Sequence, residues 1–124
     1  MKFYVCKRWG NIITHLKDAG VRVVCCQEPM SEMVPGSTDA ATEKHVPVVE
    51  ISGQNVVVKI GSVAHPMAEE HFIQWIVVET NKGYQVKHLN PGQAPEATFV
   101  LTEGESFVAA YEYCNLHGLW KKEA

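Results

Sequence analysis

Apolar and polar residues alternate through most of the second half of the chain. Residues 46–51 and 55–60 are rich in β-branched side chains and are separated by a short turn signal. Residues 72–79 and 84–89 repeat this arrangement around Asn81-Lys82-Gly83. A period near two that is broken by turn residues predicts two β-hairpins.

Two further apolar segments, 97–101 and 107–113, flank the turn signal at 102–105. Six or more short strands, with turns at roughly eight- to twelve-residue spacing, predict an antiparallel β-sandwich. No long stretch has the period of an amphipathic helix. Only residues 107–111, which contain two alanines, fit a buried helix as well as a strand. The fold class is therefore predicted to be all-β.

The beginning of the chain has a different composition. It holds three of the four cysteines, a turn signal at Trp9-Gly10 and one short strand candidate at 21–24. We place a boundary near Pro35-Gly36, which divides the chain into residues 1–35 and 36–124. A unit of fewer than about 40 residues usually needs a metal, a disulfide or a partner to fold.

Composition and charge exclude several classes of protein. The 124 residues are 46% hydrophobic with a net charge of −3, which is typical of an ordered globular protein and not of a nucleic-acid-binding one. The longest apolar run is five residues, 107–111, whereas a membrane helix needs roughly 20. The first residues lack the apolar core of an export signal, so we expect no membrane association and a cytoplasmic location.

The four cysteines and six histidines are the residues that can carry chemistry. A disulfide framework needs an oxidising compartment, so metal binding is the favoured interpretation. Each histidine alone is most simply a surface residue, but four of them fall at strand ends or in loops and can converge at one end of a sandwich. The Cys-x-x-His spacing of Cys114 and His117 can place a thiolate and an imidazole on one metal. His15 and His88 are expected to be surface residues.

Several motifs, in the same order, resemble the superoxide reductases of the desulfoferrodoxin and neelaredoxin type. The resemblance covers essentially the whole chain and rests on residues 36–39, 43–47, 61–67 with His71, 90–96 and 114–118. It implies an immunoglobulin-like β-sandwich that carries one mononuclear non-haem iron, cycling between Fe²⁺ and Fe³⁺. Position by position, the implied iron ligands are His45, His65, His71, Cys114 and His117.

The resemblance also implies the activity, which is the one-electron reduction of superoxide to hydrogen peroxide in oxidative-stress defence. It further implies a homodimer that is re-reduced by a rubredoxin-like electron donor. Lys44 would steer superoxide and order the protonating water, and Glu43 would be the sixth ligand in the ferric state. Their alternatives are an ordinary solvated lysine and a solvated loop acid. Five ligands leave one position open for a reaction, and the metal's charge attracts an anion although the protein is acidic.

Two other functions remain open. A non-catalytic iron electron-transfer protein would use the same iron without an open position, which five ligands disfavour. A zinc-stabilised binding module would need only Cys114 and a few histidines, and it leaves the Glu43-Lys44 pair beside His45 without a role.

The first 35 residues depart from the family pattern. The two-iron relatives hold a second iron there through Cys-x-x-Cys and a Cys-Cys pair, and here Trp9 stands in place of the second cysteine. Cys6, Cys25 and Cys26 remain, and a tetrathiolate iron needs four thiolates. We therefore expect a degenerate desulforedoxin-like segment without an iron site. A three-cysteine zinc or iron completed by water or a partner, or a disulfide to Cys6, stays open, and Trp9 is expected to fill the vacated volume.

Overall fold

A computed structural model describes all residues from Met1 to Ala124. The chain divides into two compact units, Met1–Val34 and Pro35–Ala124, and each is described by itself. The only helix is α1, Thr42–His45, and the structure has no helix long and apolar enough to cross a membrane.

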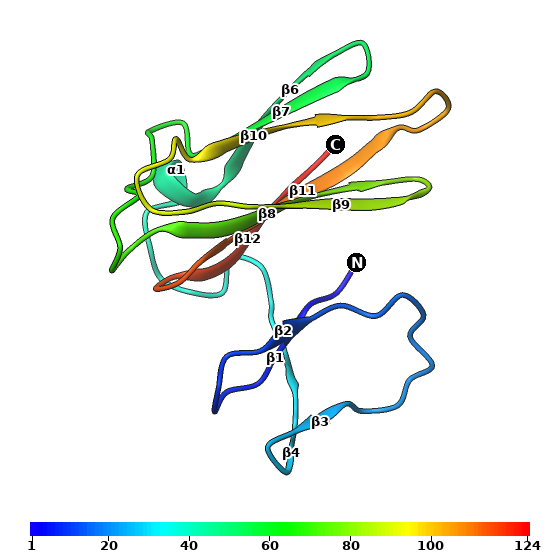
Figure 1. Ribbon diagram of the computed structural model, residues 1–124, viewed down its shortest axis with the longest axis vertical. Coiled ribbons are helices and arrows are strands. Elements are labelled where there is room, and N and C mark those ends of the chain that lie inside the picture. Colours follow the sequence, from blue (N-terminus) through cyan, green and yellow to red (C-terminus); the bar gives the residue numbers. More distant parts are fainter. The chain divides into compact units, whose positions relative to one another are not determined.

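The second unit consists of two antiparallel sheets that form two layers (Figure 1). One sheet has three strands in the order β10-β7-β6, and the other has four in the order β12-β11-β8-β9. A three-plus-four arrangement is that of an immunoglobulin-like sandwich, so the predicted fold class is confirmed. The strand bounds are β6 Pro47–Ser52, β7 Asn55–Ile60, β8 Ile73–Thr80, β9 Gly83–His88, β10 Glu96–Val100, β11 Phe107–Cys114 and β12 Gly118–Glu123.

The core of this unit lies between the two sheets. Along β7, Val56, Val58 and Ile60 are buried while their neighbours are more exposed, which is the alternation expected of a strand with one face on the core. Ile76 and Val78 of β8 join the same apolar cluster from the opposite sheet. The end of β11 reaches this cluster too, and it therefore gives the functional site a rigid base.

The predicted hairpins are present, and other connections differ from a simple meander. β6 pairs with β7 and β8 pairs with β9, both antiparallel. The segments predicted at 97–101 and 107–113 lie in different sheets, because β10 pairs with β7 and β11 pairs with β8 and β12. The ambiguous residues 107–111 form a strand, and β12 and α1 were not predicted.

The first unit is built from two-residue strands. β1 Tyr4–Val5 lies between β2 Ile12–Ile13 and β5 Ser31–Glu32, and β3 Val24–Cys25 pairs with β4 Glu28–Pro29. The strand candidate at 21–24 thus shrinks to its last residue.

Little of the first unit is buried. Phe3 and Cys6 are its only fully buried residues. Trp9 is 81% exposed, so the prediction that it fills the vacated volume is wrong. It lies at the tip of a turn closed by a hydrogen bond from the Gly10 N–H to the Cys6 carbonyl. With so small a core, apolar packing alone is a weak source of stability for this unit.

Candidate metal centre

Five side chains from five separate places in the second unit converge on one point. His45 ends α1, His65 follows β7, His71 precedes β8, Cys114 ends β11 and His117 lies in the turn before β12. Their donor atoms all lie within 4.8 Å of one another. His45, His65 and Cys114 are buried, while His71 and His117 are partly exposed. The centre is therefore anchored in the protein on one side and reachable from solvent on the other.

One asparagine ties together two of the ligand-bearing segments. The Asn115 side chain accepts a hydrogen bond from the Phe72 N–H at 2.9 Å and donates one to the Glu70 carbonyl at 3.0 Å. The segment that carries His71 is thereby fixed against the turn that follows Cys114.

A glycine allows a third and a fourth segment to meet. Gly61 has a φ of +83°, and a Cβ there would lie 2.3 Å from the Val63 carbonyl oxygen and 2.7 Å from that of Glu43. Any other residue at this position would push α1 away from the loop that carries His65. This close approach brings His45 and His65 together.

The hydrogen bonds of two histidines show what the centre is built to hold. His45 Nδ1 lies 2.8 Å from the Ala41 carbonyl oxygen and His65 Nδ1 lies 2.6 Å from that of Pro66. A carbonyl only accepts, so each Nδ1 carries the ring proton and each Nε2 presents a lone pair. The two Nε2 atoms are 3.2 Å apart, with no proton left to share between neutral rings. Facing lone pairs at this distance call for a cation.

The remaining donors support the same conclusion. His71 Nε2 is buried without a hydrogen-bond partner, and His117 Nδ1 lies 3.1 Å from His45 Nε2 and 3.9 Å from the Cys114 sulfur. Four imidazoles and one thiol suit a transition metal such as iron. The residues present therefore fit a single metal ion, which His45, His65, His71, Cys114 and His117 would hold.

Burial sets the protonation of the histidines. It lowers the pKa of His45 and His71, and it lowers the pKa of His65 to about 4. These three imidazoles are consequently neutral near pH 7, which is the form that binds a metal.

The thiol is subject to opposing effects. Burial raises the pKa of the Cys114 thiol, and the backbone N–H groups of Leu116 and His117 oppose this by lowering it. These N–H groups favour the thiolate and hold the sulfur in place, as the sequence suggested.

Trp120 is a residue of the centre that no motif singled out. Its ring stacks on His45 with the ring centroids 5.0 Å apart, and its Nε1 donates a hydrogen bond to the His117 carbonyl at 3.0 Å. It therefore positions two of the five donors. Its only signal in the sequence is its place three residues after His117.

Glu43 and Lys44 lie on exposed α1, directly before His45. Burial and His117 are the larger causes of the lowered pKa of His71, and the positive charge of Lys44 contributes to it, which places that charge close to the centre. The Glu43 carboxylate is not part of the five-donor cluster. Its main-chain carbonyl accepts hydrogen bonds from the Val63 N–H and the Ser62 hydroxyl, so α1 is fixed while both side chains stay in solvent.

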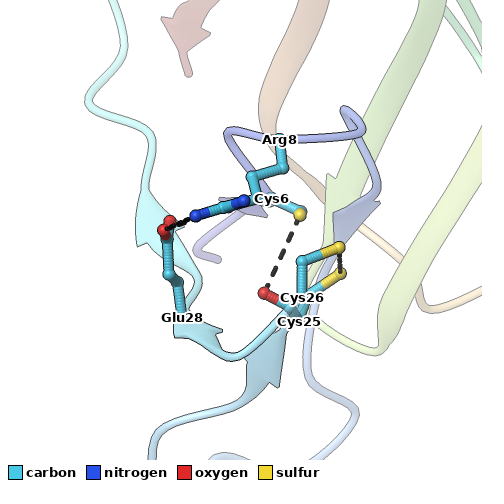
Figure 2. A network of polar contacts seen from close by, with 5 residues as sticks. All are labelled: Cys6, Arg8, Cys25, Cys26 and Glu28. Carbon is cyan, nitrogen blue, oxygen red and sulfur yellow. Dashed lines mark hydrogen bonds and ion pairs between the residues drawn. The ribbon is translucent and has the colours of Figure 1, made fainter.

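The first unit contains a second, smaller cluster. The sulfurs of Cys6, Cys25 and Cys26 lie within 4.8 Å of one another and belong to free cysteines (Figure 2). The backbone N–H of Trp9 is the main cause that lowers the pKa of Cys6 to about 7. No fourth donor belongs to this group, and His15 and His88 lie outside both clusters.

Comparison with known proteins identifies the family. The desulfoferrodoxin family model matches residues 37–123. The desulfoferrodoxin of Syntrophotalea carbinolica is 48% identical over 124 residues, which cover 99% of this chain and 96% of that protein. The chain belongs to the desulfoferrodoxin family. Within this family, the desulfoferrodoxin of Nitratidesulfovibrio vulgaris is also 48% identical, covering 99% of this chain and 96% of that one.

Solved structures of the family extend the match to three dimensions. The superoxide reductase of Treponema pallidum has a TM-score of 0.83 and 44% identity, and the match covers 98% of both chains. The one-iron superoxide reductase of Giardia intestinalis has a TM-score of 0.58 and 34% identity, covering 66% of this chain and 97% of that one. The Giardia intestinalis protein thus matches, over nearly its whole length, about two thirds of this desulfoferrodoxin-family chain.

Proposed function

We propose that this chain is a superoxide reductase with one mononuclear iron. The net reaction adds one electron and two protons to superoxide and yields hydrogen peroxide. The observation that carries the proposal is the cluster of four imidazoles and one thiol, in which two Nε2 lone pairs face each other 3.2 Å apart. When bound there, iron supplies the one-electron Fe²⁺/Fe³⁺ couple.

Each ligand residue has a defined task in this proposal. His45, His65, His71 and His117 bind as neutral imidazoles, and Cys114 binds as a thiolate. Five donors would leave one position of a six-coordinate ion for a small anion. The negative charge of the Cys114 thiolate adds electron density at the centre, and the N–H groups of Leu116 and His117 limit that effect by hydrogen bonding to the sulfur.

Lys44 guides the substrate. Superoxide is an anion and the net charge of the protein is −3, so a positive side chain near the centre would add to the attraction of the bound metal ion. The Lys44 ammonium is exposed and is near enough to contribute to the lowered pKa of His71. We assign it the steering of superoxide and the ordering of the water that delivers protons.

Glu43 is proposed as the sixth ligand in the ferric state. Its carboxylate lies outside the five-donor cluster, so its side chain has to turn toward the centre on an α1 whose main chain is already fixed. In that role it would occupy the remaining ligand position of the oxidised enzyme and would leave that position free for substrate in the reduced one.

The rest of the molecule supports a simple cellular assignment. We propose that residues 36–124 form the catalytic domain and that residues 1–35 are a degenerate desulforedoxin-like segment. None of the four cysteines forms a disulfide, as is usual for proteins of a reducing cytoplasm. The partly exposed His71 and His117 favour electron delivery from outside by a rubredoxin-like donor.

A homodimer is the assembly we propose. It is the assembly that the resemblance to the desulfoferrodoxins implies. Sedimentation of the holoprotein over a range of concentrations tests this assembly.

Metal analysis and rapid kinetics test the function together. The purified chain should contain one iron, and its oxidised form should show a thiolate-to-iron charge-transfer band. Stopped-flow mixing of the reduced protein with superoxide should consume superoxide without releasing oxygen. A colourless, zinc-loaded protein that is folded and inert toward superoxide would instead support the zinc-stabilised binding module.

A further inference from the structure

We propose that the first unit binds one zinc-class divalent cation through Cys6, Cys25 and Cys26 and leaves the fourth coordination position to water. This site differs from the five-donor centre in its location, since all three ligands lie within Met1–Val34. It also differs from a tetrathiolate iron in having an open position.

The spacing of the sulfurs fits a metal ion. Zinc–sulfur bonds of about 2.3 Å in a tetrahedron separate two sulfurs by about 3.8 Å. The Cys25 and Cys26 sulfurs are 3.8 Å apart, and the Cys6 sulfur lies within 4.8 Å of both. A disulfide needs about 2.05 Å between its sulfurs, and adjacent cysteines reach it only with strain. The three sulfurs thus have the spacing that a shared metal ion requires.

The backbone is shaped to bring the sulfurs together. Cys26 and Gln27 have φ angles of 55° and 64° in the turn between β3 and β4. Such turns normally use Asn-Gly, because most other residues are strained in this conformation. The turn directs the adjacent sulfurs of Cys25 and Cys26 to the side where Cys6 lies (Figure 2). Because this unit has almost no core, thiolate–metal bonds are a natural source of the compensating stabilisation.

Hydrogen-bond donors lie near two of the three sulfurs, those of Cys6 and Cys25. The backbone N–H groups of Trp9 and Arg8 point at the Cys6 sulfur, and Asn11 Nδ2 lies 3.8 Å from that of Cys25. Such donors stabilise metal-bound thiolates. The Arg8 guanidinium donates to the Glu28 carboxylate at 2.9 Å and so ties the Cys6 turn to β4 (Figure 2).

The fourth position is open because of Trp9. Its side chain is 81% exposed, and an indole N–H can donate a hydrogen bond but offers no lone pair to a metal. Structural zinc sites have four protein ligands, whereas sites with three keep an exchangeable water. The bound ion should therefore exchange more readily than one in a closed site.

Cobalt(II) is the probe, because it substitutes for zinc and is coloured. Titration of the iron-loaded full chain, under reducing conditions, should show uptake of one Co²⁺ with thiolate-to-cobalt absorption, and Zn²⁺ should displace it. Cys25→Ser should lose this absorption, while the matched variant Trp9→Ala should keep it. Superoxide reduction should be unchanged in both variants, so this test is independent of the five-donor centre.

A gain-of-ligand variant covers the case in which Cys25→Ser fails to fold. Trp9→Cys should complete the tetrahedron and tighten Co²⁺ binding by about tenfold or more. The proposal is overturned if the iron-loaded chain takes up no Co²⁺, if Cys25→Ser retains the absorption, or if the thiols of the reduced protein form a disulfide that blocks uptake. An unchanged affinity in Trp9→Cys would overturn it as well.

Discussion

The two cysteine-containing clusters of this chain use similar donor atoms and are supported in opposite ways. In the second unit, Cys114 ends a strand whose inward-facing residues pack in an apolar core, and His45 and His65 are each held by a main-chain carbonyl. In the first unit, two of three cysteines lie at a two-residue turn with positive φ angles, on strands of two residues. The second unit positions its donors through a packed core and side-chain hydrogen bonds, whereas the first positions its sulfurs mainly through one strained turn.

This contrast shows that three sulfurs can converge where the fourth cysteine of the family pattern is absent. Trp9 stands at that position, and the sulfurs of Cys6, Cys25 and Cys26 still lie within 4.8 Å of one another. Their arrangement depends on local backbone geometry, which the substitution of one exposed side chain does not disturb.

Removal of a ligand is the largest expected effect and separates the two clusters. Cys114→Ser should lower the rate of superoxide reduction more than 100-fold and abolish the thiolate-to-iron band, because loss of a direct ligand exceeds the 10- to 100-fold cost of outer contacts. Cys6→Ser should leave both unchanged. Stopped-flow kinetics and the visible spectrum measure the two variants, and a comparable loss in Cys6→Ser would break the comparison.

The core of the second unit should become more stable when a buried carboxyl group is removed. Glu112 is fully buried, and neither of its side-chain oxygens has a hydrogen-bond partner. Glu112→Leu should raise the free energy of unfolding by about 1–3 kcal/mol, since an unpaired polar group leaves the interior. Urea denaturation followed by circular dichroism measures this. Glu112→Gln, which keeps a buried polar group, should gain less, and destabilisation by leucine would contradict the prediction.

Removal of a lysine charge should slow the reaction with superoxide only when that lysine lies near the five-donor centre. Lys44→Ala should slow the reaction with superoxide roughly tenfold at low ionic strength and weaken its salt dependence. Lys82→Ala is the matched control. This substitution removes the same charge, but Lys82 follows β8 at the end away from His71. Stopped-flow measurements at several salt concentrations compare the two variants, and equal slowing in both would remove Lys44 from the steering role.

The smallest effect concerns stability in acid. Hydrogen bonds from Thr102 and Thr80 lower the pKa of Glu105 from 4.5 to about 2. The folded state thus holds this proton less tightly than the unfolded state does. The stabilisation is present above pH 4.5 and is lost as the pH falls toward 2. Glu105→Gln should flatten this acid limb of stability, measured by denaturation between pH 2 and 6, and an unchanged limb would show that other carboxyls set it.

The sequence predicted the regular strands well because they obey a period of two. The four strands of the two predicted hairpins lie within a residue or so of their predicted bounds. β12 was missed because its buried Leu119 and Trp120 are adjacent and charged residues follow, which hides the alternation. α1 has four residues, too few to show a helical period.

The convergence of the five donors was predicted from the family resemblance. Positions at strand ends are compatible with this convergence, but they are not sufficient to predict it. The hydrogen bonds that orient the donors depend on contacts between distant segments. Asn115 binding the main chain at residues 70–72 and Trp120 stacking on His45 are examples. Neither contact leaves a periodic trace in the sequence. The exposure of Trp9 was predicted wrongly for a related reason: a missing ligand leaves space for water as readily as for a side chain.

The carbonyl-held imidazoles of His45 and His65 have a consequence for metal selection in the cell. Because main-chain carbonyls of the protein itself fix these two rings, the facing positions of their Nε2 atoms are set by the fold. A preformed set of imidazoles and a thiolate binds divalent copper and zinc more tightly than ferrous iron. Binding of the wrong metal is therefore an inherent hazard of this site. The iron content of the protein should depend on which ions are available when the chain folds.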